Sequence, residues 1–402
     1  MRPFTSTISI DEARALLRQH AHAITRTEAI DLLAAAGRVV SADVVSDVVV
    51  PPFARSAMDG YAVRAADTRG ANQSRPVRLE IVERIFTGSL PSQAVDAWQC
   101  AEIATGAPIP VGADAVVMVE QTRPAGDTHV DIAAEAVPGQ NIGRAGADIS
   151  LGDVVVRRGD VLNPSRLGAV AAIGCARLEV FAAPRVAIVS TGNEVVRPGT
   201  LLRPGQIHDV NGFTLSAVAR AHGCEPEVHA PAIDTLGALE QVLDSCRDAD
   251  VIVFSGGSSV GDRDLVLDLV RRRGHVVFHG IAVKPGKPTL FGVVEEKPVF
   301  GMPGNPTSCL SNAYILLAPF LRATARLPVY EPRIVHARLA RTIVSQAGRH
   351  QFYTVRLEQG EAVPAFKGSG DITSLSRADG YIEIPADADT VAEGTLVQVT
   401  LF

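Results

Sequence analysis

Short apolar runs alternate with amphipathic segments between residues 184 and 325, and this alternation dominates the hydrophobic pattern of the chain. The runs at 186–189, 251–254 and 299–300 predict buried strands, whereas 213–221, 264–273 and 307–325 have the spacing of helices. Strands and helices in succession predict βαβ units, and therefore a doubly wound parallel sheet covered on both faces. Ligands bind beyond the carboxyl ends of the strands in such sheets. We therefore expect the glycine-rich loops that follow these strands to converge.

The pattern differs on either side of this region. Ser9 and Glu12 form a capping-box sequence before a predicted helix, and a second helix is predicted over 27–36, where Gly37 would end it. Short β-like runs separated by Gly and Pro turns fill 47–139. Period-two alternation at 334–339, 352–357, 381–384 and 395–402 predicts a small β-sandwich or barrel. The chain is thus predicted to be a multidomain α/β and β protein.

Composition narrows the class of protein. A chain of 402 residues is long enough for roughly two to four domains. Its 38 Lys and Arg against 44 Asp and Glu give a net charge of −6, without the broad basic surface expected of a nucleic-acid-binding protein. The five cysteines are scattered without a C-x-x-C pair, which disfavours a zinc site or a disulfide framework. No apolar signal sequence or membrane span is found, so a soluble cytoplasmic protein is expected.

The loop 301–308, with the sequence GMPGNPTS, carries the strongest signal for ligand chemistry. It follows an apolar run, and Asn305 suits a helix N-cap while Pro306 suits the first helical position. Backbone N–H groups at such a helix start attract phosphate-like anions. Lys284 and Lys287 lie on a stiff Pro-Gly loop just upstream, and two like charges so close are costly unless an anion lies between them. An anion site is therefore predicted here.

Two further loops at strand ends contain residues that can bind phosphate or a metal ion. The segment 255–262 (SGGSSVGD) lets the backbone approach a ligand and can offer hydroxyl and N–H groups to phosphate, although a tight turn before a capped helix would have the same sequence. Asp262 and Asp264 are hard oxygen ligands suited to Mg²⁺, or else they serve only the helix dipole. The loop 191–194 (TGNE) places Glu194 beyond a buried strand, which an ordinary turn would also do.

Four polar segments are ambiguous from physics alone. Asn211, in 206–212 (QIHDVNG), has the character of a helix cap, so this segment is interpreted as structural. Three segments outside the α/β region would each pass as ordinary turns: 56–61 (SAMDGY) with Asp59, 105–108 (TGAP) with Thr105, and 141–148 (NIGRAGAD) with Asp148.

Taken together, these segments resemble the molybdopterin molybdenumtransferases, the MoeA-like family that includes the gephyrin E domain. The resemblance covers nearly the whole chain, and any one of its motifs would be weak evidence. Eight motifs in order, at compatible separations, are specific. They are PFARSAMDGYAV (52–63), TGAPIPVGAD (105–114), NIGRAGAD (141–148), STGNE (190–194), QIHDVNG (206–212), SGGSSVGDRD (255–264), KPGKP (284–288) and PGNP (303–306).

The resemblance implies four domains, an elongated homodimer and a reaction. The domains are an N-terminal linking domain (1–46 and 140–182), a β-rich insert (47–139), a molybdopterin-binding α/β domain like the molybdopterin adenylyltransferases (183–326), and a C-terminal β domain (327–402). The implied reaction joins molybdate to adenylylated molybdopterin and yields molybdenum cofactor and AMP, assisted by Mg²⁺. The implied cleft is shared between subunits, and a molybdopterin adenylyltransferase is the implied upstream partner. Neither nucleic acid nor a membrane is implied.

Residue by residue, the resemblance implies roles in catalysis, metal binding and substrate binding. Catalytic roles are implied for Asp59, Glu194, Asp262 and Asp264, and metal ligation for Asp148, Glu194, Asp262 and Asp264. Substrate contacts are implied for Thr105, Thr191, Ser255, Gly256, Gly257, Ser259, Lys284, Lys287, Pro303, Asn305, Pro306 and Ser369. Of these, Asp59, Thr105 and Asp148 are expected from the neighbouring chain or an adjacent domain.

Two positions depart from the family pattern, and two other functions stay open. Family members usually carry Asp where this chain has Ala54, and Arg where it has Thr354, with Arg356 as a candidate substitute. Residues 257–261 match the G-x-S-x-G motif of serine hydrolases, with Ser259 as nucleophile, although the predicted strand ends several residues earlier. A non-catalytic dimeric scaffold of the gephyrin type is the other alternative. The sequence does not set a preference between molybdate and tungstate.

Overall fold

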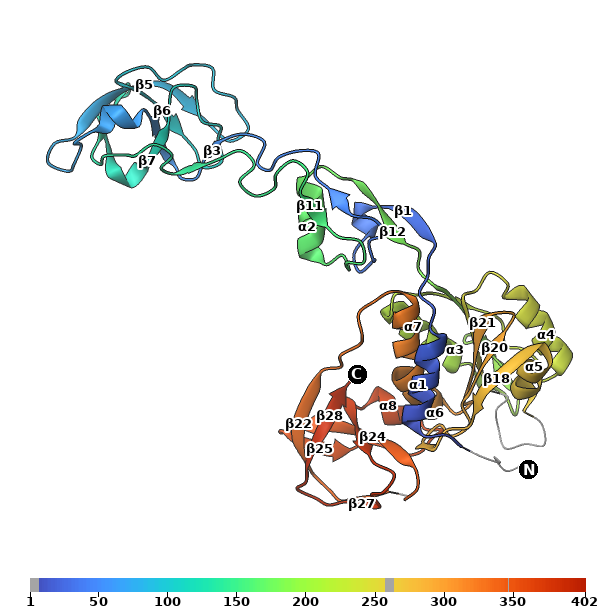
Figure 1. Ribbon diagram of the computed structural model, residues 1–402. Helices are drawn as coiled ribbons and strands as arrows, with labels where there is room; N and C mark the ends of the chain where they lie inside the picture. Colours follow the sequence, from blue (N-terminus) through green and yellow to red (C-terminus); the bar gives the residue numbers. More distant parts are fainter. Residues whose placement is uncertain (1–6, 257–263, 346) are drawn as a thin grey trace. The chain divides into compact units, whose positions relative to one another are not determined.

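The structure, a computed structural model, describes residues 7–256, 264–345 and 347–402 (Figure 1). The chain divides into two compact units. Unit 1 comprises Met1–Glu28, Gly37–Ser41 and Glu179–Phe402, and unit 2 comprises Ala29–Ala36 and Ala42–Leu178. In the described ranges, no helix combines the length and the apolar character needed to cross a membrane.

A six-stranded sheet of order β16-β13-β17-β21-β20-β18 forms the centre of the α/β part of unit 1. Four of its strands are parallel: β16 (Glu225–Val228), β13 (Arg185–Ser190), β17 (Val251–Ser255) and β21 (Lys297–Met302). The predicted parallel sheet is confirmed for these four strands. Strand β20 (Leu290–Val294) is instead antiparallel to both of its neighbours, β21 and β18 (Gly274–His279), so β18 points the same way as the four parallel strands. Strand β20 is antiparallel to β21 because the two-residue turn Glu295–Glu296, with positive φ at both residues, joins the two strands directly.

Helices cover both faces of this sheet (Figure 1). The predicted N-terminal helix is confirmed: it begins after Ser9, whose hydroxyl accepts a hydrogen bond from the Glu12 N–H at 3.1 Å. The bounds are α1 (Ile10–His20), α3 (Asn211–Ala221), α4 (Leu236–Ser245), α5 (Leu265–Arg273), α6 (Pro306–Asn312), the π-helical turn η4 (Ala313–Leu317) and α7 (Ala318–Thr324). A short parallel pair, β14 (Val195–Val196) with β15 (Ile207–His208), lies outside the sheet.

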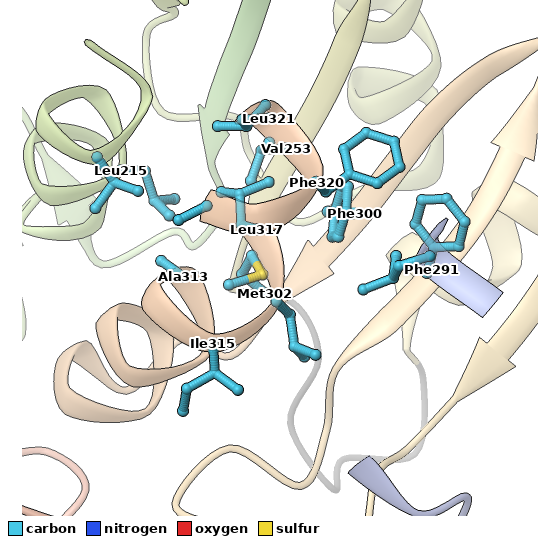
Figure 2. Packing of buried hydrophobic residues seen from close by; sticks show 14 of the residues in the cluster. Leu215, Val253, Phe291, Phe300, Met302, Ala313, Ile315, Leu317, Phe320 and Leu321 are labelled. Carbon is cyan, nitrogen blue, oxygen red and sulfur yellow. The ribbon is translucent and has the colours of Figure 1, made fainter. Parts of the chain in front are cut away.

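Consecutive residues of the central strands point to opposite faces, so the sheet buries both. On one face, Val253 packs in a cluster with Leu215, Phe300 and Phe320 (Figure 2). On the other face, Phe254 packs with side chains of α4 and α5. Each fully buried phenylalanine contributes about 1.5–3 kcal/mol through the removal of apolar surface from water. The two cores therefore hold the strand ends rigidly in place.

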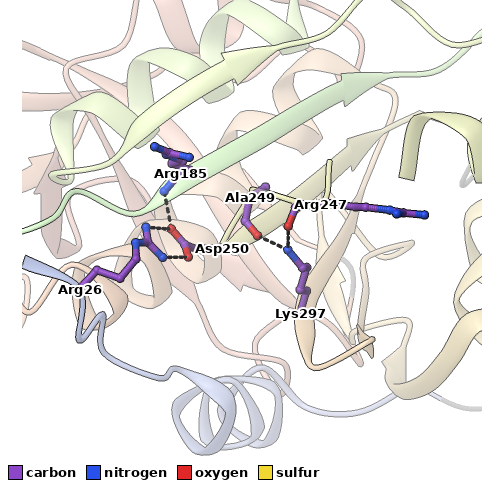
Figure 3. Close-up of polar contacts among 6 residues, drawn as sticks. All are labelled: Arg26, Arg185, Arg247, Ala249, Asp250 and Lys297. Atoms are coloured by element: carbon purple, nitrogen blue, oxygen red, sulfur yellow. Dashed lines mark hydrogen bonds and ion pairs between the residues drawn. The ribbon is translucent and has the colours of Figure 1, made fainter. Parts of the chain in front are cut away.

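Polar contacts fasten the amino ends of the strands (Figure 3). Asp250, just before β17, accepts hydrogen bonds from both terminal nitrogens of Arg26 at 2.6 and 2.8 Å, and from the Arg185 N–H at 2.8 Å. The Lys297 ammonium donates to the carbonyl oxygen of Ala249 at 2.8 Å and to that of Arg247. The opposite, carboxyl ends of the strands are the ends that parallel sheets use for ligands.

The C-terminal part of unit 1 is a small closed barrel, so the predicted β domain is confirmed. Its strands run in the order β24 (His350–Glu358), β25 (Glu361–Pro364), β22 (Ile334–Leu339), β28 (Leu396–Leu401) and β26 (Gly380–Ile384), and β26 pairs back with β24. Leu339, Val355 and Ile382 belong to its core. Outside the ring are α8 (Thr373–Ser376), the pair β23 (Ile343–Val344) with β27 (Thr390–Val391), and β19 (Val283–Lys284), which pairs in parallel with β24.

Unit 2 contains a second six-stranded sheet, of order β7-β4-β6-β5-β9-β8, as the β-like runs at 47–139 predicted. Its strands are β4 (Gly60–Val63), β5 (Val77–Ile85), β6 (Gln99–Ile103), β7 (Ala115–Met118), β8 (Thr122–Pro124) and β9 (His129–Ile132), with 3-10 turns η2 (Ala65–Thr68) and η3 (Val119–Gln121). The remaining elements are β2 (Val44–Val45) paired with β11 (Val154–Val156), β3 (Arg55–Ser56) paired with β10 (Ile142–Gly143), and α2 (Pro164–Ala172). Both faces of the large sheet bury apolar side chains.

The helix predicted over 27–36 is wrong. Thr27–Asp31 form strand β1, Leu32–Ala34 form one 3-10 turn (η1), and Arg177–Phe181 form strand β12. The β-branched Thr27 and Ile30 favour an extended backbone over a helix. Gly37, with φ +77°, ends a turn here, as glycine readily does.

Candidate functional site

The carboxyl ends of three neighbouring strands meet at one place in unit 1. Ser190, Ser255 and Met302, the last residues of β13, β17 and β21, lie in register across the sheet. The next turn packs without spare room, because a Cβ on Gly256 would lie 2.4 Å from the Thr191 carbonyl oxygen. A Cβ on Gly304 would lie 3.3 Å from the Gly256 Cα. The loops predicted to converge therefore do so, at least in the residues that the structure describes.

A cavity of about 1290 Å³ opens at these strand ends. Ten residues with implied roles line it, and they come from four loops of the α/β part and one turn of the barrel part. They are Thr191, Glu194, Ser255, Gly256, Lys284, Lys287, Pro303, Asn305, Pro306 and Ser369. Gly257, Ser259 and Asp262 lie outside the described residues.

The loop that carries Lys284 and Lys287, called the lysine loop, is held in place by Asn312 of α6. The Asn312 side-chain nitrogen donates to the Gly286 carbonyl at 2.8 Å and to the Thr289 hydroxyl at 2.6 Å, and that hydroxyl donates to the same carbonyl at 2.9 Å. Gly286 has φ +103°, and a Cβ there would lie 2.3 Å from the Asn312 amide nitrogen. The loop conformation therefore requires glycine between the two lysines.

The loop Pro303–Pro306 is joined to the barrel part. The Asn305 amide donates to the Ser369 hydroxyl at 3.1 Å, and the Thr307 N–H donates to the Ser369 carbonyl at 3.1 Å. Asn305 stands at the predicted N-cap position, but its side chain does not accept a hydrogen bond from the helix that follows. It connects two walls of the cavity instead.

Asn211 is not the helix cap that the sequence suggested. Helix α3 begins at Asn211 itself, and the side chain donates to Ser255 Oγ at 2.7 Å and to the Gly304 carbonyl at 2.8 Å. Because that carbonyl can only accept, the amide nitrogen must face it, and Asn211 Oδ1 is left buried without a partner among the described residues. Asn211 therefore ties two of the strand-end loops together at the floor of the cavity.

Asp234 is a cavity residue that sequence reasoning missed. It follows Ala232, which forms a parallel bridge with Thr191, and so it lies beside the loop that carries Glu194. Burial and the negative charge of Glu194 raise the pKa of Asp234, and the nearby Thr191 hydroxyl offsets this only in part. Asp234 Oδ1 and Thr191 Oγ1 are buried without a hydrogen bond of normal geometry to any described residue. Unsatisfied polar groups that line a cavity are typical of a site for a ligand or ion.

Asp264 does not line the cavity. Its Oδ1 accepts the Leu267 N–H at 2.9 Å as the cap of α5, and its Oδ2 lies 3.1 Å from His279 Nε2. The helix-cap interpretation of this residue is the one that matches its contacts. Thr354 and Arg356 also lie away from the cavity: Thr354 is 2% exposed, and Arg356 forms an ion pair with Glu358 at 3.0 Å.

The ambiguous segments of unit 2 meet one another. Ser56 pairs with Ile142, the Gly106 N–H donates to the Ser56 carbonyl at 2.8 Å, and the Ala57 N–H donates to the Asn141 carbonyl at 2.9 Å. The three segments, although far apart in sequence, therefore form one cluster in unit 2.

Within this cluster, Asp59 is fixed by Thr105. Its Oδ1 accepts the Thr105 N–H at 2.7 Å and the Thr105 hydroxyl at 3.0 Å. The backbone hydrogen bond first, and the hydroxyl second, lower the pKa of Asp59, so the carboxylate stays ionised. A second, smaller cavity of about 210 Å³ adjoins Asp59. Asp148 is an exposed residue of the same unit.

Magnesium chemistry suits the acids of the large cavity. In the described part of the chain, no three His, Cys, Asp or Glu side chains cluster as a metal cage. Mg²⁺ rarely uses such a cage, because it is usually held by one or two carboxylates together with substrate phosphates. Glu194 and Asp234, with an unsatisfied oxygen on the latter, match that requirement.

Comparison with known proteins agrees along the whole chain. The model of the MoeA N-terminal region (domains I and II) matches residues 8–174, that of a probable molybdopterin binding domain matches 187–323, and that of the MoeA C-terminal region (domain IV) matches 336–402. A relative from Mycobacterium tuberculosis, molybdopterin molybdenumtransferase 2, is 38% identical over 382 residues, covering 92% of this chain and 94% of its own. The molybdopterin molybdenumtransferase of Haemophilus influenzae is 31% identical over 404 residues, covering 98% of each chain.

Solved structures give the same result. Two crystal structures of molybdopterin biosynthesis MoeA protein from Pyrococcus horikoshii match with TM-scores of 0.83 and 0.81 at 38% and 30% identity. They cover 98% and 99% of this chain, and 99% and 100% of their own. The chain therefore belongs to the MoeA family of molybdopterin molybdenumtransferases.

Proposed function

We propose that this chain inserts molybdate into adenylylated molybdopterin and releases AMP, in a Mg²⁺-dependent step of molybdenum cofactor biosynthesis. The observation that carries the proposal is the lining of the large cavity: two lysines on one fixed loop, and two acids, Glu194 and Asp234, on neighbouring loops. An adenylylated pterin brings a pyrophosphate, and molybdate is a dianion, so the reaction gathers negative charge that such lysines can bind. The family relatives are named as transferases, which supports neither the serine hydrolase nor the scaffold alternative.

Each group of the cavity has a proposed task. Lys284 and Lys287 hold the oxyanions, and Asn305 and Ser369 fix the opposite wall through their mutual hydrogen bond. Asn211 holds the Ser255 and Gly304 loops at the spacing that the substrate requires. Glu194 and Asp234 would hold Mg²⁺, which when bound neutralises charge on the pyrophosphate oxygens. Asp262, Gly257 and Ser259 keep the roles that the resemblance implies for them.

The reaction can be tested directly. Purified protein supplied with adenylylated molybdopterin, molybdate and Mg²⁺ is expected to release AMP and to yield cofactor that activates a molybdenum-free apoenzyme. Sulfate in place of molybdate is the matched control, since it is a tetrahedral dianion that contains no molybdenum. Chelation of Mg²⁺ is expected to slow the release of AMP. Stable adenylylated substrate in the complete mixture would refute the proposal.

We also propose that the chain acts as a homodimer whose cleft is completed by Asp59 and Thr105 of the neighbouring subunit. The support is that Asp59 is an exposed, ionised carboxylate whose orientation is fixed by Thr105, so it is available to a neighbouring subunit. Asp148 would serve the same cleft.

Mixing two inactive variants tests the shared cleft. Asp59→Ala and Glu194→Ala are each expected to abolish AMP release as homodimers. After joint refolding or co-expression, a mixed dimer contains one cleft with both acids intact, so about one quarter of wild-type activity is expected from a random mixture. Absence of any recovery, with mixed dimers verified by two different affinity tags, would show that each cleft is built from one chain.

The remaining expectations are proposals as well. We propose the four domains 1–46 with 140–182, 47–139, 183–326 and 327–402, a molybdopterin adenylyltransferase as the upstream partner, and a cytoplasmic location. The upstream partner follows from the chemistry, because an adenylylated substrate must come from an adenylyl transfer reaction.

A further inference from the structure

Two cations of the large cavity have no role in the reaction as described so far. Arg349 and Lys367 both line it, and both belong to the barrel part of unit 1 rather than to the strand-end loops. We propose that Arg349 and Lys367 form a second oxyanion-binding wall that faces the same substrate as the lysine loop. This inference rests on the proposed function and names further binding residues for it.

The position of Arg349 follows from strand pairing. Arg349 directly precedes β24, whose first residues pair in parallel with β19, so that Val283 lies opposite His350 and Lys284 lies opposite Gln351. The His350 N–H donates to the Ala282 carbonyl at 2.9 Å, which fixes this register. The backbone of Arg349 therefore lies beside the start of the lysine loop, and Arg349 lines the same cavity as Lys284 and Lys287. Like charges gathered in this way are costly unless an anion joins them.

Lys367 comes from the turn that carries Ser369. Its N–H donates to the Ser374 hydroxyl at 3.0 Å, and its ammonium lies 3.4 Å from the Thr373 hydroxyl. Because the Ser369 hydroxyl accepts a hydrogen bond from the Asn305 amide, this turn is joined to the Pro303–Pro306 loop. Lys367 therefore lines the same cavity from the side formed by the Ser369 turn and the Pro303–Pro306 loop.

Neither cation is neutralised within the described ranges. No carboxylate there lies within 4 Å of the Arg349 or Lys367 charge, in contrast to Arg356, which pairs with Glu358 at 3.0 Å on the same strand as His350. Thr354 cannot supply a charge, since it is an alcohol that is 2% exposed and whose Oγ1 has no described partner. The barrel part of this chain thus offers its positive charge to the cavity through Arg349 and Lys367.

The ligand chemistry is a tetrahedral oxyanion, which molybdate and a substrate phosphate both provide. Binding of molybdate alone and of AMP alone is measured by calorimetry for wild type, Arg349→Gln, Lys367→Gln and the double variant. Arg356→Gln is the matched control, because its ion pair lies outside the cavity. We expect at least one oxyanion to bind about tenfold more weakly to Arg349→Gln, and about fivefold more weakly to the more exposed Lys367→Gln. The difference in anion affinity between each variant and the wild type should become smaller at high salt, because salt screens the charges.

The pattern of losses identifies the source of the anion. A loss for molybdate alone assigns the wall to molybdate, and a loss for AMP alone assigns it to the phosphate; either supports the inference. Unchanged affinity of the double variant for both anions overturns it, as does failure of the wild type to bind either one. Thermal unfolding verifies folding, and if Arg349→Gln fails to fold, Lys367→Gln at an exposed site still decides. If the wild type releases AMP but the double variant binds both anions with normal affinity, only this inference is refuted. If the wild type releases no AMP but loses affinity for an anion when Arg349 and Lys367 are replaced, only the proposed reaction is refuted.

Discussion

The double substitution Lys284→Met, Lys287→Met is expected to reduce AMP release by about 10²–10⁴-fold, because each lost contact between an ammonium and an oxyanion costs about 1.5–3 kcal/mol. Methionine retains the length and apolar stem of lysine, so the substitution removes charge with little change in packing. The loop itself should persist, since Asn312 holds it through Gly286 and Thr289. Single-turnover AMP release and molybdate affinity, measured on the same preparations, provide the test.

A control variant separates this site from a general effect of positive charge. Arg220→Met removes one charge from the exposed last turn of α3, outside the cavity, and should leave AMP release within twofold of wild type, as surface substitutions usually do. If the double lysine variant released AMP as fast as Arg220→Met and wild type do, the lysine loop would not be the anion site. Equal losses in both would point to long-range electrostatics instead.

The lysine loop could be predicted from sequence because its signal is local. Two lysines separated by Pro-Gly, and Pro-Gly-Asn-Pro after an apolar run, need only the rule that parallel sheets use their carboxyl ends. The structure brings these segments to one cavity with Thr191, Glu194 and Ser369. The barrel was predictable for a similar reason, since period-two alternation is a local property of each strand.

Residues whose role depends on distant partners were harder to predict. Asn211 precedes a helical pattern, as a cap would, and its true partner Ser255 is 44 residues away. Asp234 stands just before Thr235, the cap of α4, where an acid is ordinary. Only the parallel bridge between Thr191 and Ala232 brings it to Glu194. One signal was available, because Asp234 follows a strand in an α/β pattern, and the strand-end rule could have been applied to β16 as well.

Asp264 shows the same dependence on distant partners. An acid beside a glycine-rich loop has the composition of a metal ligand, and sequence cannot distinguish that role from a helix cap. The contact between Asp264 Oδ2 and His279, 15 residues later, is visible only in three dimensions. The turn at Glu295–Glu296 likewise carries no glycine or asparagine, which is why the antiparallel strand β20 was not predicted.

Asp234→Asn is expected to stabilise the free protein at neutral pH while lowering AMP release by about 10²–10³-fold, the loss typical of removing one charged group that acts at the reacting centre. The pKa of Asp234 is raised above its ordinary value by burial and by Glu194. The folded state therefore binds this proton more tightly than the unfolded state does, so stability falls as pH rises from the ordinary pKa through the raised one. Asparagine carries no charge, and it removes that loss of stability.

Thermal unfolding at acidic and neutral pH tests this trade-off between stability and activity. Wild type and Asp234→Asn should unfold at similar temperatures at low pH, and the variant should unfold at a higher temperature at pH 7. Mg²⁺ should raise the unfolding temperature of the wild type at pH 7 more than that of the variant, since a cation relieves the repulsion between Glu194 and Asp234. Asp248→Asn, at an exposed position of unit 1, should behave as wild type throughout. A variant that is less stable than wild type at neutral pH and equally active would show that Asp234 supports the fold rather than the chemistry.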